Sequence, residues 1–287
     1  MFPINKNLSL GFSPCPNDTF IFYGLVHGLI DSAGVTFAEP ILEDVERLNL
    51  WAMAKTLDVT KLSFHALGHV LDEYCLLTAG SALGRGCGPL LVSGSVRHFD
   101  ELRHLKIAIP GKMTTAAMLL QMFLSDCHQL VELVELVEMR FDRIMGAINR
   151  GEVDAGVIIH ESRFTYGEQG LFCLQDLGEW WEQSTGLPIP LGCIAARRNL
   201  GRDRILAIDQ AIKNSVAYAF AHQDDCLPYI RSKSQELEPE IVRNHIQLYV
   251  NEFSRDLGEE GIAAVNVFMD RGRQAGVLPE NASELMI

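Results

Sequence analysis

Strand-like and helix-like segments alternate through the first two hundred residues, and this alternation limits the fold more than any other feature of the chain. The strand-like segments are 8–12, 35–42, 57–63, 89–94, 106–110, the second half of 131–139, 153–160 and 190–198. Apolar residues three and four apart predict helices over 19–30, 43–55, 64–74, 114–127 and 141–152. Repeated strand–helix units place strands side by side with helices over both faces, so the chain is predicted to be an α/β protein with mostly parallel sheets.

The pattern changes after Arg202, where three helical segments follow at 203–222, 239–252 and 259–275. A chain of 287 residues is long for one compact core, which favours two domains. The predicted division is a discontinuous lobe one (1–93 plus 200–287), a lobe two (96–193) and crossovers near 94–95 and 194–199. The C-terminal helices are expected to pack on lobe one.

Charge and composition exclude several classes of protein. The net charge is −13, and no Lys/Arg-rich run offers the basic face that a nucleic-acid binder needs. Neither an apolar stretch of ~20 residues nor a signal peptide is evident, so we expect a cytoplasmic protein that does not bind membranes. The seven cysteines are odd in number and contain no C-x-x-C pair, which argues against a disulfide framework or a zinc ribbon.

Ligands of such sheets bind beyond the carboxyl ends of the strands. The loops that leave the predicted strands there are 13–19, 60–64, 80–88, 110–115 and 160–166. These loops carry most of the distinctive polar residues, so the sequence predicts a small anionic ligand in a cleft between the lobes. An anion in so acidic a protein must be held locally, by helix N-termini, backbone amides and a few cations.

The first loop, SPCPNDT, ends a strand and opens a helix. Asn17 and Asp18 offer side-chain hydrogen bonds to a ligand, although both are also ordinary helix-capping residues. A thiol near a helix start, such as Cys15, can act as a nucleophile. Because the sequence implies no base beside Cys15, a structural thiol is the favoured interpretation.

Two further loops supply candidate anion-binding groups. Lys61 and Ser63 end a strand, where a lysine either pairs with a carboxylate or is solvated. Thr114 and Thr115 begin a helix after a Pro-Gly pair, so their hydroxyls and the free amides there either bind an anion or only cap the helix.

His160 directly follows an apolar strand and is the candidate general base. Its ordinary pKa of roughly 6.5 suits proton abstraction near neutral pH, although a lone histidine is often structural. Glu161 is a candidate to orient the imidazole, but adjacent strand residues point to opposite faces. Arg163 and Tyr166 are secondary candidates.

His65 and His69 have the i, i+4 spacing of a two-histidine metal pair. No glutamate lies between them and no further ligand is spaced nearby, so packing or surface histidines are favoured and no metal is expected.

Six motifs together resemble a known family in order and spacing. They are SPCPNDTFIFYGLVHG, DVTKLSFHALGHVL, GRGCGPLLV, PGKMTTAAMLL, VIIHESRFTY and GLPIPLGCIAARR. They resemble the 1,4-dihydroxy-6-naphthoate synthases of the futalosine route to menaquinone, from residue 8 to the C-terminal helices. The VELVELVE stretch is the part that fits the family pattern least.

The resemblance implies a fold like the type II periplasmic binding proteins and a lyase that converts cyclic dehypoxanthinyl futalosine to 1,4-dihydroxy-6-naphthoate. It implies neither a metal nor an organic cofactor. His160 matches the family's proposed catalytic base, and the SPCPND loop lines the cleft. Two segments match substrate-binding segments of the family. The first is Lys61, Leu62 and Ser63, and the second is Thr114 and Thr115.

Other interpretations stay open at this point. The same fold serves solute-binding proteins without chemistry, since fold alone does not decide function. The sister enzyme chorismate dehydratase has a related fold, and a regulator's effector domain is a further possibility, although no helix-turn-helix segment precedes residue 8. Which group holds the substrate carboxylate, Lys61 or the threonine helix start, is also left open.

Overall fold

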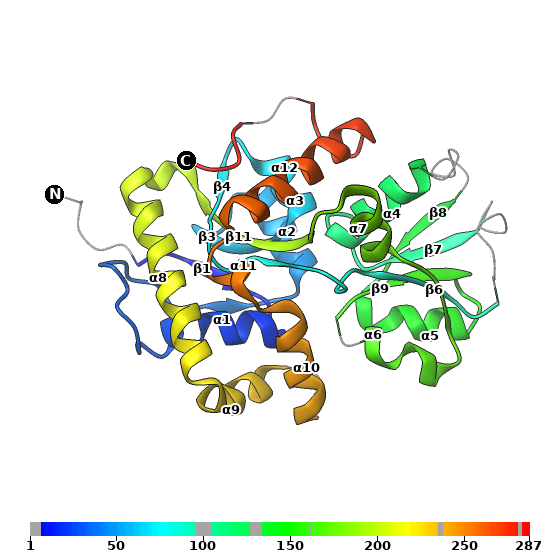
Figure 1. The fold of residues 1–287 in the computed structure, drawn as a ribbon, viewed down its shortest axis with the longest axis horizontal. Helices are drawn as coiled ribbons and strands as arrows, with labels where there is room; N and C mark the ends of the chain where they lie inside the picture. The colour runs from blue at the N-terminus through cyan, green and yellow to red at the C-terminus, as the bar shows by residue number, and fades with distance from the viewer. Residues whose placement is uncertain (1–6, 96–104, 127–133, 161, 235–237, 281–282) are drawn as a thin grey trace.

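A computed structural model describes residues 7–95, 105–126, 134–160, 162–234, 238–280 and 283–287. Its chain forms two α/β halves that lie side by side, each built on one sheet covered by helices (Figure 1). This confirms the predicted fold class.

The first sheet has the order β2-β1-β3-β11-β4, and β5 also pairs with β11. Its strands are β1 (Leu10–Phe12), β2 (Ile41–Leu42), β3 (Val59–Ser63), β4 (Tyr74–Leu76), β5 (Ala82–Gly84) and β11 (Ile189–Arg197). β1 is parallel to β2 and β3, whereas β11 is antiparallel to β3, β4 and β5.

The second sheet has the order β10-β6-β9-β7-β8. Its strands are β6 (Leu90–Ser93), β7 (Lys106–Ile109), β8 (Glu135–Glu138), β9 (Ala155–Ile158) and β10 (Phe172–Asp176). β7 is parallel to β8 and β9, whereas β6 is antiparallel to β9 and β10. Among the described strands, β11 is therefore antiparallel to the rest of the first sheet, and β6 to the rest of the second. The other strands of each sheet are parallel to one another, as predicted.

The two reversed strands are the first that the chain forms after passing from one half to the other. β6 already pairs within the second sheet, although residues up to 93 were predicted in lobe one. β11 pairs within the first sheet from Ile189, although residues up to 193 were predicted in lobe two. The crossings precede these strands rather than falling near 94–95 and 194–199, because an apolar strand pattern does not indicate which sheet a strand joins.

The described helices cover both sheets. They are α1 (Pro16–Val26), α2 (Val45–Met53), α3 (Phe64–Val70), α4 (Thr115–Asp126), α5 (Ile144–Asn149), α6 (Ser162–Thr165), α7 (Leu177–Thr185), α8 (Arg202–Ala221), α9 (Gln223–Lys233), α10 (Pro239–Tyr249), α11 (Glu252–Arg255) and α12 (Gly258–Gln274). α8, α9 and α10 pack on α1, as expected for helices of the first half, while α12 contacts both β11 and α4 of the second half.

α1 begins earlier than predicted. The sequence predicted a loop from residue 13 and a helix over 19–30, but the helix starts at Pro16. Proline is tolerated in a first helical turn because its missing N–H would have no partner there. Asn17 and Asp18 consequently lie inside the first turn and do not cap it, and Cys15 occupies the N-cap position without a side-chain capping bond.

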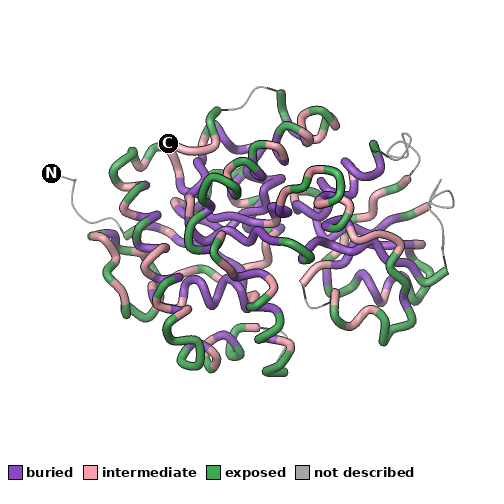
Figure 2. Tube along the Cα trace, viewed as in Figure 1, coloured by how far each residue is buried: buried purple, intermediate pink, exposed green. Residues whose placement is uncertain are grey.

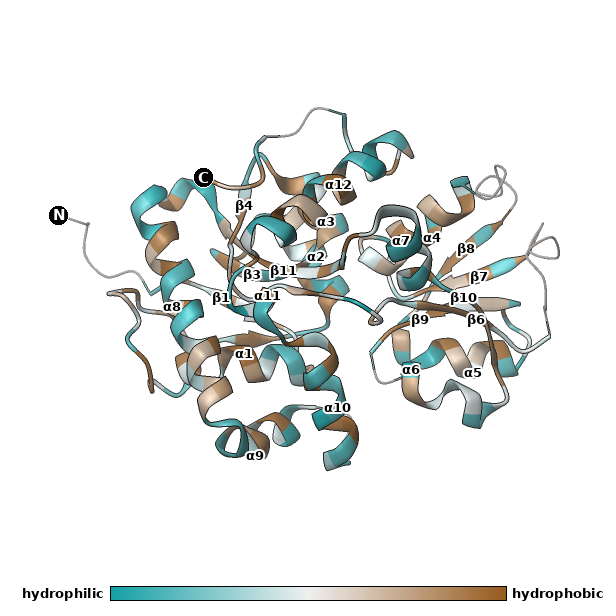
Figure 3. Cartoon of the chain, in the orientation of Figure 1, coloured by the Kyte–Doolittle hydropathy of each residue, from teal (hydrophilic) through white to brown (hydrophobic). Residues whose placement is uncertain are grey.

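One hydrophobic core spans both halves, beside a separate cluster within each half. This core joins side chains of the first half, such as Leu62 and Phe64, to Leu120 and Val157 of the second. Figure 2 shows buried segments running through both sheets and across the junction, and Figure 3 shows hydrophilic stretches on the outer helices. Burial of a large apolar side chain stabilises a fold by about 2 kcal/mol, so this cluster fixes how the halves meet.

Candidate active site

A cavity of about 100 Å³ lies where elements of the two halves meet. Polar side chains from both halves line it, together with two residues of α10. The polar and aromatic members of the lining are Ser13, Asn17, Asp18, Lys61, Ser63, Thr115, His160, His245 and Tyr249. The structure thus brings together residues of four of the five loops that the sequence singled out, and Cys87 of the fifth, 80–88, also lines the cavity.

Asp18 and Lys61 form a buried ion pair in the wall of this cavity. Lys61 Nζ lies 2.5 Å from Asp18 Oδ1, and the two side chains are 6% and 1% exposed. Ser13 donates to Asp18 Oδ2 through its backbone N–H (3.2 Å) and its hydroxyl (2.7 Å). The charge of Lys61 is therefore already balanced by a carboxylate of the protein, so an anionic ligand is not needed to neutralise it.

Asn17 continues this network toward α10. Its Nδ2 donates to Asp18 Oδ1 at 2.8 Å, and its Oδ1 lies 3.1 Å from Nε2 of His245. The hydrogen bonds thus connect His245, Asn17, Asp18 and Lys61 in one chain. Both Asn17 and Asp18 are buried, and their side chains bond to this network instead of capping the helix.

His160 stands just beyond the end of β9 with a backbone φ of 57°. The left-handed region is unusual for a residue other than glycine, and such strained residues cluster at functional sites. Its ring lies 5.0 Å from that of Phe141 and 6.0 Å from that of His245, and Cys15 Sγ is 3.9 Å from its Nδ1. The structure therefore places the predicted base at the wall of the cavity. Glu161, its predicted orienting partner, lies outside the described residues.

The other residues of the β3 segment divide between two faces. Lys61 and Ser63 line the cavity, whereas Leu62 is fully buried in the shared core, as alternation along a strand requires. Ser63 Oγ accepts a hydrogen bond from Asn49 Nδ2 at 3.1 Å. The side chain of Leu62, the third predicted residue of this segment, therefore does not reach the cavity.

Thr114 and Thr115 stand at the start of α4, but their hydroxyls are engaged within the protein. Thr114 Oγ1 donates to Gly111 O and accepts from the N–H of Ala117, which makes it a capping residue. Thr115 Oγ1 donates to Leu191 O and accepts from the N–H of Phe64, so it ties the two halves together. Thr115 lines the cavity and Thr114 does not.

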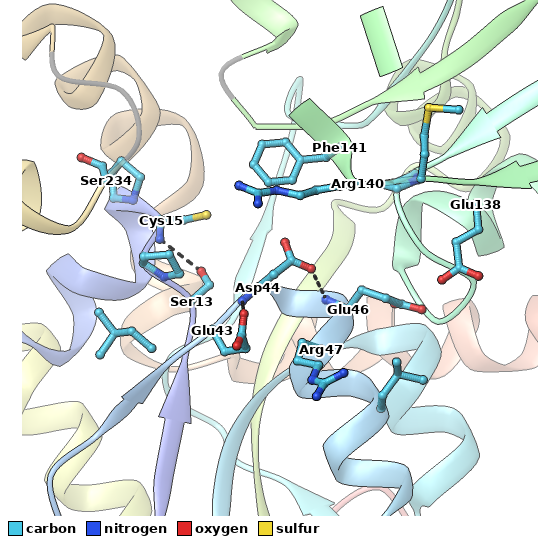
Figure 4. A pocket seen from close by; sticks show the side chains of 16 residues that line it. Ser13, Cys15, Glu43, Asp44, Glu46, Arg47, Glu138, Arg140, Phe141 and Ser234 are labelled. Atoms are coloured by element: carbon cyan, nitrogen blue, oxygen red, sulfur yellow. Dashed lines mark hydrogen bonds between the residues drawn. The ribbon is translucent and has the colours of Figure 1, made fainter. Parts of the chain in front are cut away.

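Cys15 faces a larger outer pocket of about 610 Å³, drawn in Figure 4. Ser13 lines both this pocket and the inner cavity, so the two adjoin. Arg140 and Phe141 lie across the outer pocket from Asp44 and Glu46 in that view.

His65 and His69 form a packed pair, with ring centroids 5.2 Å apart. Nδ1 of His65 lies 3.2 Å from the carbonyl oxygen of Thr114, and burial, with a contribution from His69, lowers the pKa of His65 to about 4. Among the described residues no group of three or more His, Cys, Asp or Glu is arranged to hold a metal ion.

The secondary candidates have structural contacts. Arg163 donates to Gly88 O at 2.5 Å and to Asp176 Oδ2 at 2.6 Å, so it fastens α6 to the start of β6 and to the end of β10. Tyr166 packs against the smaller core cluster of the second half. Neither lines the cavity.

Two residues that the sequence pattern does not indicate, His245 and Tyr249, are brought to the cavity by α10. Both lie on the buried face of that helix with Val242 and Ile246, so the local pattern is that of an ordinary core-facing helix. Only the packing of α10 on α1 reveals that this face meets the site.

The two α/β halves have the fold of the periplasmic-binding-protein class, and solved structures bear out this fold. A protein from Archaeoglobus fulgidus matches with a TM-score of 0.86 and 34% identity over 95% of this chain and 98% of that chain. The periplasmic aliphatic sulphonate-binding protein of Escherichia coli matches with a TM-score of 0.67 and 12% identity over 97% and 90%. The latter shows the fold alone.

The sequence narrows this class to one family. The menaquinone biosynthesis family matches residues 8–274, so the chain belongs to it. A 1,4-dihydroxy-6-naphthoate synthase of Thermus thermophilus is 52% identical over 90% of this chain and 91% of its own length. One of Streptomyces coelicolor is 44% identical over 95% of each. These relatives are enzymes. In the described part of the chain, no helix is long and apolar enough to cross a membrane.

Proposed function

We propose that this chain is a lyase that converts cyclic dehypoxanthinyl futalosine to 1,4-dihydroxy-6-naphthoate in the cytoplasm. The observation that carries the proposal is His160, held in a left-handed backbone conformation at the wall of a cavity lined in part by polar side chains, in a chain of this family. The names of the two relatives support the reaction. The cavity between two lobes, one per sheet, is the proposed substrate site.

His160 is the proposed proton acceptor. Removal of a proton lets a carbon–carbon bond of the cyclic sugar portion break, and the sugar carbons beyond that bond leave as a separate fragment. The second ring then becomes aromatic, and aromatisation supplies driving force. A positioned base typically contributes on the order of 10²- to 10⁴-fold to such a step. Phe141 and His245 pack beside the His160 ring and limit its orientations. The proposed reaction uses neither a metal nor an organic cofactor.

The start of α4 is the proposed partner of the substrate carboxylate. The competing candidate, Lys61, is already paired with Asp18 at 2.5 Å. Thr115 and Ala116 line the cavity at the first turn of a 12-residue helix, whose N-terminus favours an anion. In this proposal Lys61, Ser63, Asn17 and Asp18 bind the polar remainder of the substrate, and Leu62 and Thr114 support the segments that hold it.

The test of the base is His160→Asn. We expect the variant to bind cyclic dehypoxanthinyl futalosine and to lose at least about 10²-fold in kcat, because a proton acceptor is removed without a large change of shape. The matched control is His27→Asn at an exposed position of the first half, which should leave kcat unchanged. A rate for His160→Asn within threefold of the wild type would eliminate His160 as the base.

The same assay tests the reaction. Formation of 1,4-dihydroxy-6-naphthoate by the wild-type protein supports the proposal. Binding of the substrate without product would indicate a solute-binding protein, and turnover of chorismate as sole substrate would indicate chorismate dehydratase.

A further inference from the structure

His245 is a buried histidine whose two ring nitrogens have different surroundings. The side chain is on α10 and is 1% exposed. Its Nε2 lies 3.1 Å from Asn17 Oδ1. The amide nitrogen of Asn17 donates to Asp18, so the amide oxygen is the end that faces the ring. An oxygen accepts only, and therefore Nε2 of His245 carries the proton and donates.

The other nitrogen, Nδ1, is a buried acceptor without a partner among the residues that the structure describes. Burial lowers the pKa of His245 well below 6.5, and the neighbouring His160 and Lys61 side chains lower it further. The imidazole is therefore neutral, and Nδ1 presents a lone pair. Buried polar groups are nearly always hydrogen-bonded. Of the buried side-chain atoms that lack a partner in the described structure, Nδ1 of His245 is the one whose residue lines the cavity, so it is an acceptor open to assignment there.

His245 shares the cavity with the proposed base. Its ring is nearly parallel to that of His160, at 19° and 6.0 Å, and both rings line the cavity with Lys61. A carboxylate has no proton to donate to Nδ1, whereas a hydroxyl donates one readily. The chemistry of this position therefore selects a hydroxyl group of the ligand.

We propose that His245 is a substrate-binding residue whose Nδ1 accepts a hydrogen bond from a hydroxyl of the sugar-derived ring, and so sets the scissile part of the substrate against His160. This inference rests on the proposed function. Asn17 has a defined part in it, because its amide oxygen fixes the tautomer that leaves Nδ1 free to accept.

Two variants separate this role from a merely structural one. In His245→Gln the amide can still donate to Asn17 but offers no acceptor at the position of Nδ1. In His245→Asn an amide oxygen can take that position, while the hydrogen bond to Asn17 is lost. Gln247→Ala, at an exposed position of the same helix, is the matched control.

We expect His245→Gln to keep the thermal unfolding temperature within a few degrees and to raise KM for cyclic dehypoxanthinyl futalosine by about tenfold or more, since a buried substrate hydroxyl loses its acceptor. His245→Asn should keep KM within about threefold and lower the unfolding temperature instead. The control should change neither quantity.

A KM for His245→Gln within twofold of the wild type overturns the inference, and so does an equal rise in both variants. The wild-type rate in the same assay tests the proposed function separately. If the wild-type protein converts the substrate and His245→Gln has an unchanged KM, only the proposed role of His245 is wrong and the proposed function stands.

Discussion

At the scale of single residues, contacts rather than residue types decide what the polar groups of the site can do. Lys61 is a cation at a strand end, but its partner is Asp18, and Asp18 also accepts from Ser13 and Asn17. Two buried charges stay stable only while each has its partner and its hydrogen bonds. The pair therefore belongs to the structure of the cavity as much as to ligand binding.

Replacing one partner of this ion pair should destabilise the protein through the charge that it leaves unpaired, so the effects of the two single substitutions should not add. We expect Asp18→Asn to destabilise the protein by about 3–5 kcal/mol, because it leaves the buried ammonium uncompensated. Lys61→Met should cost less, since three hydrogen bonds to Asp18 survive. The double variant should lose less than the sum of the two, as measured by urea unfolding. Simple additivity would contradict a coupled pair.

At the scale of elements, helix α2 holds the loop that leads into α4. Glu46 Oε1 accepts from the N–H of Met113 at 3.0 Å, and Asn49 Nδ2 donates to Met113 O at 3.2 Å. Asn49 Oδ1 also accepts from the N–H of Ser63 at 2.9 Å. One helix of the first half therefore sets both the end of β3 and the start of α4, where the two proposed substrate-binding segments lie.

Asn49→Ala tests this connection. Asn49 is fully buried, and its loss leaves backbone groups of Ser63 and Met113 unpaired, which should cost about 2–6 kcal/mol at roughly 1–3 kcal/mol for each group. KM should rise as well because both segments shift. Met53→Ala, at an exposed position of the same helix, should change stability by about 0.5 kcal/mol or less. An Asn49 variant as stable as this control would contradict the role.

At the scale of the whole molecule, the halves are joined through a common core, and α3 lies inside that junction. α3 contacts both β11 and α4, and its His65 bonds the carbonyl of Thr114 across the halves. The pKa of His65 is about 4 in the folded chain, against 6.5 when unfolded. Between these values the unfolded chain binds a proton that the folded chain does not, so stability falls as the pH falls from about 6.5 to about 4.

His65→Asn should make unfolding less sensitive to acid. At pH 5 the shift of His65 accounts for about 2 kcal/mol of lost stability, at about 1.4 kcal/mol per pH unit. The asparagine amide can keep the donor to Thr114 without gaining a charge. Urea unfolding at pH 7 and pH 5 measures the difference, and we expect the variant to lose about 2 kcal/mol less than the wild type. Equal losses would show that His65 is not the titrating group.

Several parts of the fold and site were predictable from local pattern, and others were not. The strand-end position of His160 follows from the apolar run before it, and the cavity does contain this residue. β10 was missed because its residues are exposed or only half-buried, which gives no clear alternation. α9 was missed because Pro228 interrupts a weakly apolar helix. His245 was missed because a lone histidine on an apolar helix face is typical of a core.

The sequence by itself determined the alternating elements, the family motifs and the chemistry available at each loop, because these depend on side chains close together along the chain. The tertiary structure decided which sheet β6 and β11 join, that Lys61 is paired with Asp18, and that His245 reaches the site. Asn17 and His245 are 228 residues apart, so only the closure of the fold brings them together. Local sequence encodes backbone preference and burial, whereas partners across such distances are selected by packing.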